Sequence, residues 1–170
     1  QNIRRLNLIS KIFPSSKILI PFRDPLQQSM SLFLQHRRFI KEQNEDKFVR
    51  DYMSWTGHSE FGLDYEMIHS NNLKYSNANE FNHWLEQWYL SYKLVLDFVD
   101  YNQQCYLISY ELLCSEEKVW LKLKDLLGLC EECQFIFKQN RKEVELNFDK
   151  ALYAKCCKLH ELLLLKSYCG

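Results

Sequence analysis

Glycine and proline are scarce in this sequence, with four glycines and three prolines among 170 residues. These two residue types form most tight turns and interrupt helices, so their scarcity argues against a chain of many tight turns and favours a helix-rich one. The first glycine is Gly57. The sequence therefore has no Gly-rich turn near its start that could wrap a phosphate group.

Long apolar runs and an excess of charge are also absent. No apolar run approaches the roughly 18–20 residues that span a bilayer, and nothing near the start resembles a signal peptide, so we expect no membrane span. Acidic and basic residues balance at 22 each. This balance disfavours a general nucleic-acid binder and an anionic-membrane binder, and it requires any anion site to be local.

The cysteines do not have the spacing of a disulfide framework, and the first residue implies either processing or truncation. Seven cysteines are an odd number without framework spacing, which predicts reduced thiols and a cytoplasmic localisation. The chain begins with Gln1 instead of Met, from which we expect a fragment of a longer protein. We find no internal boundary and expect residues 1–170 to form one domain.

The first 22 residues predict a helix, a turn and a strand. Apolar residues at helical spacing favour a helix over residues 1–13, and Pro14-Ser15-Ser16 ends it. Residues 17–22 are short, apolar and compatible with a buried strand. This order is the second half of a βαβ unit, so we expect the preceding strand to lie upstream of residue 1.

A helix is predicted directly after this strand. Asp24 can cap it, and Pro25 suits its first turn because the missing N–H costs nothing there. We expect Asn44 to cap a further helix that runs to about Thr56 and ends at Gly57. The residues predicted to face inward are Leu26, Met30, Phe33 and Ile40 in the first helix and Phe48, Val49, Tyr52 and Met53 in the second.

The second half of the chain predicts a loop, a long helix, a strand and two more helices. Residues 57–76 lack a steady period and are expected to form a surface loop or short helical pieces. Asn77 and Glu80 have the spacing of a capping box before the strongest helix, whose stripe runs Phe81, Trp84, Leu85, Trp88, Tyr92, Leu96 and Val99. Then follow a strand at 105–109, a helix from Ser115 to Leu127 ended by Gly128, an unassigned stretch at 129–147 and a helix at 149–167.

Arg23 and Ser31 combine the side chains that a phosphate group needs. An Arg at the end of a strand lies where open α/β sheets bind ligands, and the following helix adds unpaired N–H groups. Arg offers a planar fork of donors and Ser adds a hydroxyl donor. The alternative is that Arg23 pairs with Asp24 or Glu42 and that Ser31 is only a small helix residue.

The segment FRDPLQQSMS resembles the 3′-phosphate-binding motif of the sulfotransferases. In that motif Arg, then Asn or Asp, then Pro is followed by Ser eight residues after the Arg, as in Arg23, Asp24, Pro25 and Ser31. The resemblance extends to most of the chain. The aromatic helix at 81–99, the S-Y-E-x-L segment that begins at Ser109, and the lead-in RLNLISKIFPSSKILIPFRDP resemble the family, and residues 36–62 resemble its bacterial-type branch.

The resemblance implies a fold, an activity and a cosubstrate. The fold would be α/β, a P-loop-NTPase-like parallel sheet flanked by helices, helix-rich and incomplete at its N-terminus. The activity would be transfer of a sulfuryl group from 3′-phosphoadenosine 5′-phosphosulfate (PAPS) to an acceptor hydroxyl or amine. Arg23 and Ser31 would hold the 3′-phosphate, with Arg141 as a weaker positional candidate. The implied partners are PAPS, its product adenosine 3′,5′-bisphosphate and an unknown acceptor.

The sequence departs from this family at one central feature. The family holds the 5′-phosphosulfate in a Gly-rich loop after its first strand, and no G-x-x-x-[ST] turn exists here. We therefore expect the C-terminal part of a sulfotransferase, inactive alone. A non-catalytic, helix-rich interaction module derived from the fold remains the alternative. Another P-loop-like phosphotransferase is weaker, because no G-x-x-x-x-G-K-[ST] pattern accompanies Arg23.

The loop at 57–76 contains two candidates for a general base. The family needs a group that accepts the proton of the acceptor, and His58 and Glu60 are the candidates. The alternative is a solvated loop histidine beside a surface glutamate. The basic run His36-Arg37-Arg38 could steer an anionic nucleotide, although a solvated helix face explains it better.

Two further patterns favour structural interpretations. Cys130 and Cys133 form C-x-x-C and are followed by Cys156, Cys157 and His160, but the second cysteine pair is adjacent instead of spaced, so we predict no metal site and free buried thiols. The stripe of Trp84, Trp88 and Tyr92 could form a ligand platform, but its helical spacing favours a core position.

Overall fold

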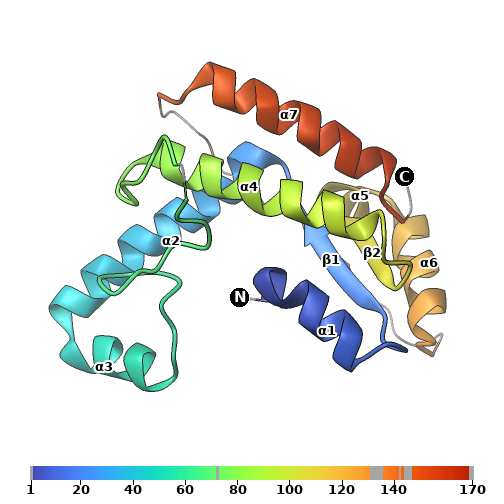
Figure 1. Cartoon of the computed structure of the whole chain (residues 1–170), viewed down its shortest axis with the longest axis horizontal. Coiled ribbons are helices and arrows are strands. Elements are labelled where there is room, and N and C mark those ends of the chain that lie inside the picture. Colours follow the sequence, from blue (N-terminus) through green and yellow to red (C-terminus); the bar gives the residue numbers. More distant parts are fainter. Residues whose placement is uncertain (1, 72, 131–135, 142, 144–146, 169–170) are drawn as a thin grey trace.

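A computed structural model describes residues 2–71, 73–130, 136–141, 143 and 147–168. Figure 1 shows the arrangement of the elements. In chain order these are η1 (Asn2–Arg5), α1 (Leu6–Ile12), β1 (Ile18–Phe22), α2 (Pro25–Glu45), α3 (Lys47–Trp55), α4 (Phe81–Val99), β2 (Cys105–Ser109), α5 (Tyr110–Ser115), α6 (Glu117–Leu127) and α7 (Lys150–Leu165).

Two parallel strands form the sheet in the described part of the chain. Strand β1 pairs with β2 in a register that runs from Ile18 opposite Cys105 to Phe22 opposite Ser109. Parallel neighbours need a long crossover, which α2, α3 and α4 supply. The predicted strands at 17–22 and 105–109 are thus confirmed to within one residue, and so is the α/β class with its helix-rich character.

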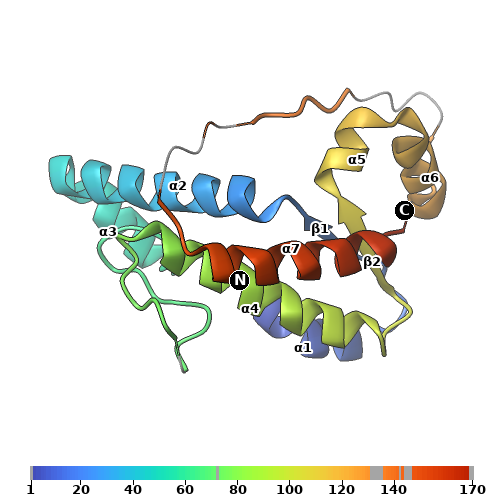
Figure 2. The same ribbon diagram turned by 90° about the horizontal axis from the view of Figure 1, so that it is seen from above.

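Helix α4 is the element around which the others pack. It lies between α1 and α7 in both views (Figures 1 and 2) and also contacts α2. Its inner face joins α1, both strands and α7 in one core, which the predicted stripe anticipated. The buried members of this core are Leu6, Ile20, Phe22, Leu85, Trp88, Tyr92, Val95, Cys105, Leu107, Leu152, Cys156, Leu159 and Leu163.

The start of α2 agrees with the sequence, whereas the start of α3 does not. The Asp24 carboxylate accepts a hydrogen bond from the backbone N–H of Gln27 at 2.9 Å, and Pro25 is the first helical residue. Asn44 does not cap α3, because α2 continues to Glu45 and Asn44 donates to the carbonyl of Ile40 within it. Asp46 is the actual N-cap of α3.

The prediction that Phe48 and Tyr52 face inward is wrong. Their side chains are 61% and 53% exposed, and Trp55 is 73% exposed. Among the described elements, α3 packs mainly on α2, at the edge of the molecule (Figure 1). Only Met53 is buried on this helix, so its aromatic side has no element to cover it and the aromatic rings contact each other instead.

Later helix ends differ from the sequence predictions by a few residues. Asn77 and Glu80 hydrogen-bond to each other, but in a turn before α4, and no side chain caps that helix. Ser115 ends the short helix α5, and α6 begins at Glu117. Gly128 ends α6 as predicted, with a left-handed φ of 66°. Asp149 caps α7.

Candidate functional site

The two parallel strands end side by side, and the residues that follow them meet. Phe22 is paired with Ser109, so Arg23 and Tyr110 leave the sheet at the same edge. The guanidinium carbon of Arg23 lies 4.7 Å from the centre of the Tyr110 ring, which is within the range of a cation–π contact. Arg23 therefore occupies the expected position beyond the carboxyl ends of the strands.

The guanidinium of Arg23 is held by residues that are distant in sequence. Its Nη2 donates to the carbonyl of Asn140, and its Nε lies 4.0 Å from Oε1 of Glu111. The side chain is 17% exposed, and within the described residues Nε is buried without a hydrogen-bond acceptor. The pairings with Asp24 or Glu42 that the sequence left open do not form: Asp24 caps α2, and Glu42 pairs with Arg38 at 2.7 Å.

Further hydrogen bonds fix the surroundings of Arg23. Oε1 of Glu111 accepts from the backbone N–H of Asp24 at 3.0 Å. The hydroxyl of Tyr110 donates to the carbonyl of Lys138 at 3.0 Å and accepts from the N–H of Asn140 at 3.2 Å. We call Arg23, Asp24, Tyr110, Glu111 and Asn140 the strand-end cluster. It joins the ends of both strands, the start of α2 and the segment 138–140.

The other predicted phosphate-binding residues, Ser31 and Arg141, make no hydrogen bond or ion pair with Arg23 in the described part of the chain. Ser31 is half-buried and lies two turns beyond Asp24 on the same face of α2, since seven residues complete nearly two turns. Arg141 is exposed and directly follows Asn140, whose carbonyl accepts from Arg23. Segment 136–141 contains no helix or strand.

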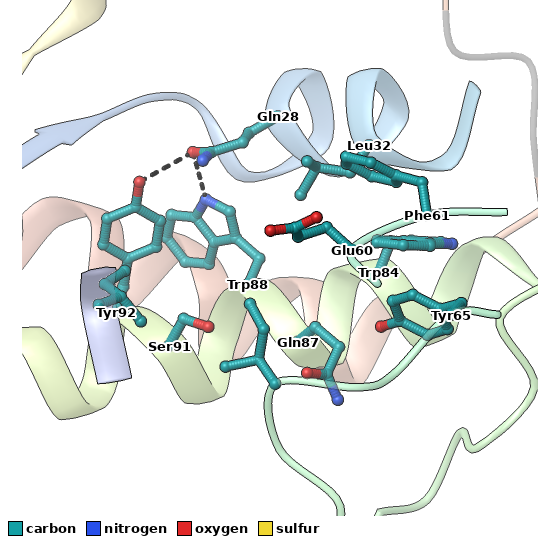
Figure 3. A pocket seen from close by; sticks show the side chains of 12 residues that line it. Gln28, Leu32, Glu60, Phe61, Tyr65, Trp84, Gln87, Trp88, Ser91 and Tyr92 are labelled. Atoms are coloured by element: carbon teal, nitrogen blue, oxygen red, sulfur yellow. Dashed lines mark hydrogen bonds between the residues drawn. The ribbon is translucent and has the colours of Figure 1, made fainter. Parts of the chain in front are cut away.

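A second feature is a cavity of about 240 Å³ between α2, α4 and the loop at 57–76 (Figure 3). At one end, Oε1 of Gln28 accepts from Nε1 of Trp88 and from the hydroxyl of Tyr92, each at 3.1 Å. We call this space the aromatic cavity. It is lined by Ile3, Gln28, Leu32, Glu60, Phe61, Tyr65, Ile68, Trp84, Gln87, Trp88, Ser91 and Tyr92.

Buried histidines fasten the loop that closes this cavity. His36 is 3% exposed and its Nδ1 accepts from the N–H of Gly62 at 3.2 Å. His83 is fully buried and donates from Nδ1 to the carbonyl of Tyr75 at 2.8 Å, which leaves Nε2 to accept from the hydroxyl of Tyr65 at 2.9 Å. Burial lowers the pKa of both histidines. His36 is therefore a structural residue and not part of a surface that steers a nucleotide.

His58 and Glu60 contact each other at the start of the loop. Nδ1 of His58 lies 3.1 Å from Oε2 of Glu60, and their side chains are 57% and 29% exposed. Glu60 lines the aromatic cavity. Within the described residues, no hydrogen bond or ion pair joins either side chain to Arg23, so the structure places this pair with the cavity and not with the strand-end cluster.

The cysteines are spread through the structure. Cys156 is buried, and its thiol donates to the carbonyl of Leu85 at 3.8 Å; burial raises its pKa to about 12. Cys133 of the C-x-x-C pattern lies outside the described residues. Among those that are described, no three His, Cys, Asp or Glu side chains gather as metal ligands. The described part of the chain also holds no helix with the length and apolar content that crossing a membrane requires.

Sequence reasoning treated the core role and the ligand-platform role of the aromatic stripe as alternatives, and it missed the partners of Arg23. Trp84, Trp88 and Tyr92 were predicted as core, and their burial confirms that, yet they also form one wall of the cavity. Helical spacing indicates that a face is covered but not how completely it is filled. Asn140 carries no sequence signal, because its contact with Arg23 uses only its backbone carbonyl.

Comparisons of the chain with protein-family models, with curated proteins and with solved structures found no match. The functional interpretation therefore rests on the residues and the geometry described above.

Proposed function

We propose that this chain is a sulfotransferase-family domain of P-loop-like fold whose strand-end cluster binds the 3′-phosphate of PAPS. The supporting observation is Arg23: it stands at the shared end of two parallel strands, directly before a capped helix, with a buried Nε that no described residue accepts from. A phosphate oxygen is a suitable acceptor for that N–H. Ser31 and Arg141 would supply further donors from α2 and from the segment after Asn140.

The reaction would be an in-line transfer of the sulfuryl group. The acceptor oxygen or nitrogen forms a bond to sulfur while the bond between sulfur and the 5′-phosphate oxygen breaks, and adenosine 3′,5′-bisphosphate leaves. The proton of the acceptor passes to a base, for which His58 and Glu60 are the candidates. Positioning and charge stabilisation provide most of the rate in such a displacement. Binding of the 3′-phosphate should therefore raise the rate by positioning the nucleotide, even though this phosphate is remote from sulfur.

Binding of adenosine 3′,5′-bisphosphate tests the proposal directly. By isothermal titration calorimetry we expect the unmodified chain to bind this nucleotide and Arg23→Ala to bind it about ten- to hundredfold more weakly, because one charge-assisted contact is worth about 1.5–3 kcal/mol. Arg38→Ala is the matched control, since Arg38 is exposed and its ion pair among the described residues is with Glu42 on the same helix. Adenosine 5′-monophosphate lacks the 3′-phosphate, so its affinity should be the same for Arg23→Ala and for the unmodified chain.

Two results would contradict the proposal. One is the absence of saturable nucleotide binding to the folded chain. The other is equal affinity of Arg23→Ala and the unmodified chain for the bisphosphate. The latter would leave Arg23 with a structural role only, in its contacts with Tyr110, Glu111 and Asn140.

A non-catalytic interaction module is the second candidate, and one observation favours it. Phe48, Tyr52 and Trp55 form an exposed aromatic surface on α3. On a monomer such a patch is unusual enough to indicate a contact with another molecule. If the nucleotide does not bind and Phe48→Ser with Trp55→Ser abolishes a concentration-dependent association seen in sedimentation, the module is the better description.

A further inference from the structure

The aromatic cavity combines an apolar wall with one negative charge. Rings from two separate segments line it: Phe61 and Tyr65 from the loop, and Trp84 and Trp88 from α4. Phe61 stacks on Trp84 with ring centres 5.8 Å apart, so the rings form a continuous surface. In Figure 3 the carboxylate of Glu60 extends between Leu32 and Trp88, into the space that the rings enclose.

Among the described residues, the carboxylate of Glu60 forms an ion pair with one side chain, His58, which lies on the same loop. Oε2 contacts Nδ1 of His58, whose side chain is 57% exposed. Arg4 and Arg5 line a neighbouring hollow that Glu60 also borders, but in the described part of the chain neither forms an ion pair with it. The carboxylate therefore faces an apolar space that no Lys, Arg or His of the described residues lines.

Charge complementarity identifies the ligand that this cavity fits. A protonated amine would meet the carboxylate of Glu60 and the faces of Trp84 and Trp88, both of which attract cations. The apolar part of the ligand would fill the remaining volume. Since a cavity of about 150 Å³ holds a benzene molecule, about 240 Å³ has room for one aromatic ring with a short chain.

We propose that the aromatic cavity is a binding site for a small aromatic amine, in which Glu60 pairs with the ammonium group. This inference concerns binding alone and does not depend on the nucleotide at the strand-end cluster. A neutral ligand of the same shape would bury the same apolar surface but would bring no cation to the Glu60 carboxylate, which would keep only its contact with His58. The site should therefore select for charge, and this selectivity distinguishes it from an apolar hollow of no specificity.

The test compares 2-phenylethylamine with 2-phenylethanol, which have one aromatic ring and the same chain length but differ in charge at pH 7. Binding is followed by tryptophan fluorescence, since two of the four tryptophans line the cavity. We expect the amine to bind the unmodified chain at least tenfold more tightly than the alcohol. Glu60→Gln should reduce the affinity for the amine to that for the alcohol and leave the alcohol unchanged.

Two further variants locate the effect. Glu66→Gln is the matched control: Glu66 lies on the same loop and borders the neighbouring hollow but does not line the cavity, so the selectivity should remain. Leu32→Trp should fill the cavity and reduce the affinity for both the amine and the alcohol. Equal affinities for amine and alcohol, an unchanged amine affinity in Glu60→Gln, or no saturable signal would each overturn the proposal. Arg23→Ala, which should weaken binding of the nucleotide, should bind the amine normally, so the two proposals can fail separately.

Discussion

The strand-end cluster and the aromatic cavity both adjoin the first turn of α2, yet they are built in opposite ways. The cluster is polar, and backbone and side-chain hydrogen bonds hold it at the exit of two short strands. The cavity is apolar, and it is bounded by the longest helices and by a loop without regular structure. Tyr92 connects the cavity wall to β1, since its one hydroxyl proton is shared between Oε1 of Gln28 at 3.1 Å and the carbonyl of Pro21 at 2.9 Å.

This difference separates the region that stabilises the fold from the region proposed to bind the nucleotide. The cavity wall coincides with the core: Trp88 is 2% exposed and belongs to the cluster of buried residues that unites α4, α7 and the sheet. In the strand-end cluster, Asn140 is exposed and the other four residues are only partly buried, and all five lie outside that core. Substitutions in the cavity wall should therefore affect folding first, whereas substitutions at the strand ends should affect a ligand more than the fold.

Trp88→Ala should produce the largest change in stability. The substitution removes a buried ring and leaves Gln28 with one donor fewer, so we expect the free energy of unfolding to fall by about 3–5 kcal/mol. Urea denaturation followed by circular dichroism measures this. A loss below 1 kcal/mol would show that the cavity wall is not part of the folding core and would erase the distinction drawn above.

Acid should destabilise the fold, in part through the two histidines that hold the loop of the aromatic cavity; burial also lowers the pKa of His69 and of His160 on α7. Burial depresses the pKa of His36 and His83 below 6.5 in the folded state, so the unfolded chain binds more protons as the pH falls through about 6.5. Stability is therefore present above that pH and is lost as the pH falls toward the folded pKa values. Each histidine contributes a slope of at most about 1.4 kcal/mol per pH unit.

The pH effect has a structural marker that can be checked. Protonation of His36 at Nδ1 removes the acceptor for the N–H of Gly62, so the loop should detach before α4 unfolds. Denaturation curves between pH 7 and 5 should show a shallower slope for His36→Gln, whereas His58→Gln, at an exposed position, should keep the full slope. A pH-independent unfolding free energy in the unmodified chain would contradict the assigned role of the buried histidines.

Asp24→Ala should have the smallest effect of the three. It removes the side chain that accepts from the N–H of Gln27 at the start of α2, and loss of such a cap costs about 1 kcal/mol. Asp24→Ser retains an acceptor and should restore most of the loss. If Asp24→Ala lowers the free energy of unfolding as much as Trp88→Ala, the strand end contributes more to stability than its partial burial indicates.

Local patterns in the sequence were sufficient for most of the regular structure. The strands at 17–22 and 105–109, the Asp24 cap, the Gly128 stop and the stripe on α4 all depend on residues within a few positions of each other, and each is confirmed. The wrong predictions concern residues whose burial depends on whether another element of the fold covers them. Phe48 and Tyr52 have the period of a buried face, but no described element covers that side of α3.

The helix-rich α/β class and the position of Arg23 at the end of a strand follow from local sequence, because propensity, capping and hydrophobic period act over short distances. The contacts of Arg23 follow from the packing of distant segments, since Glu111 and Asn140 lie 88 and 117 positions further along the chain. Such packing also places Glu60 at the border of an aromatic space. Such a cavity depends on how α2, α4 and the loop pack against each other, and packing of distant segments leaves no periodic trace in the sequence.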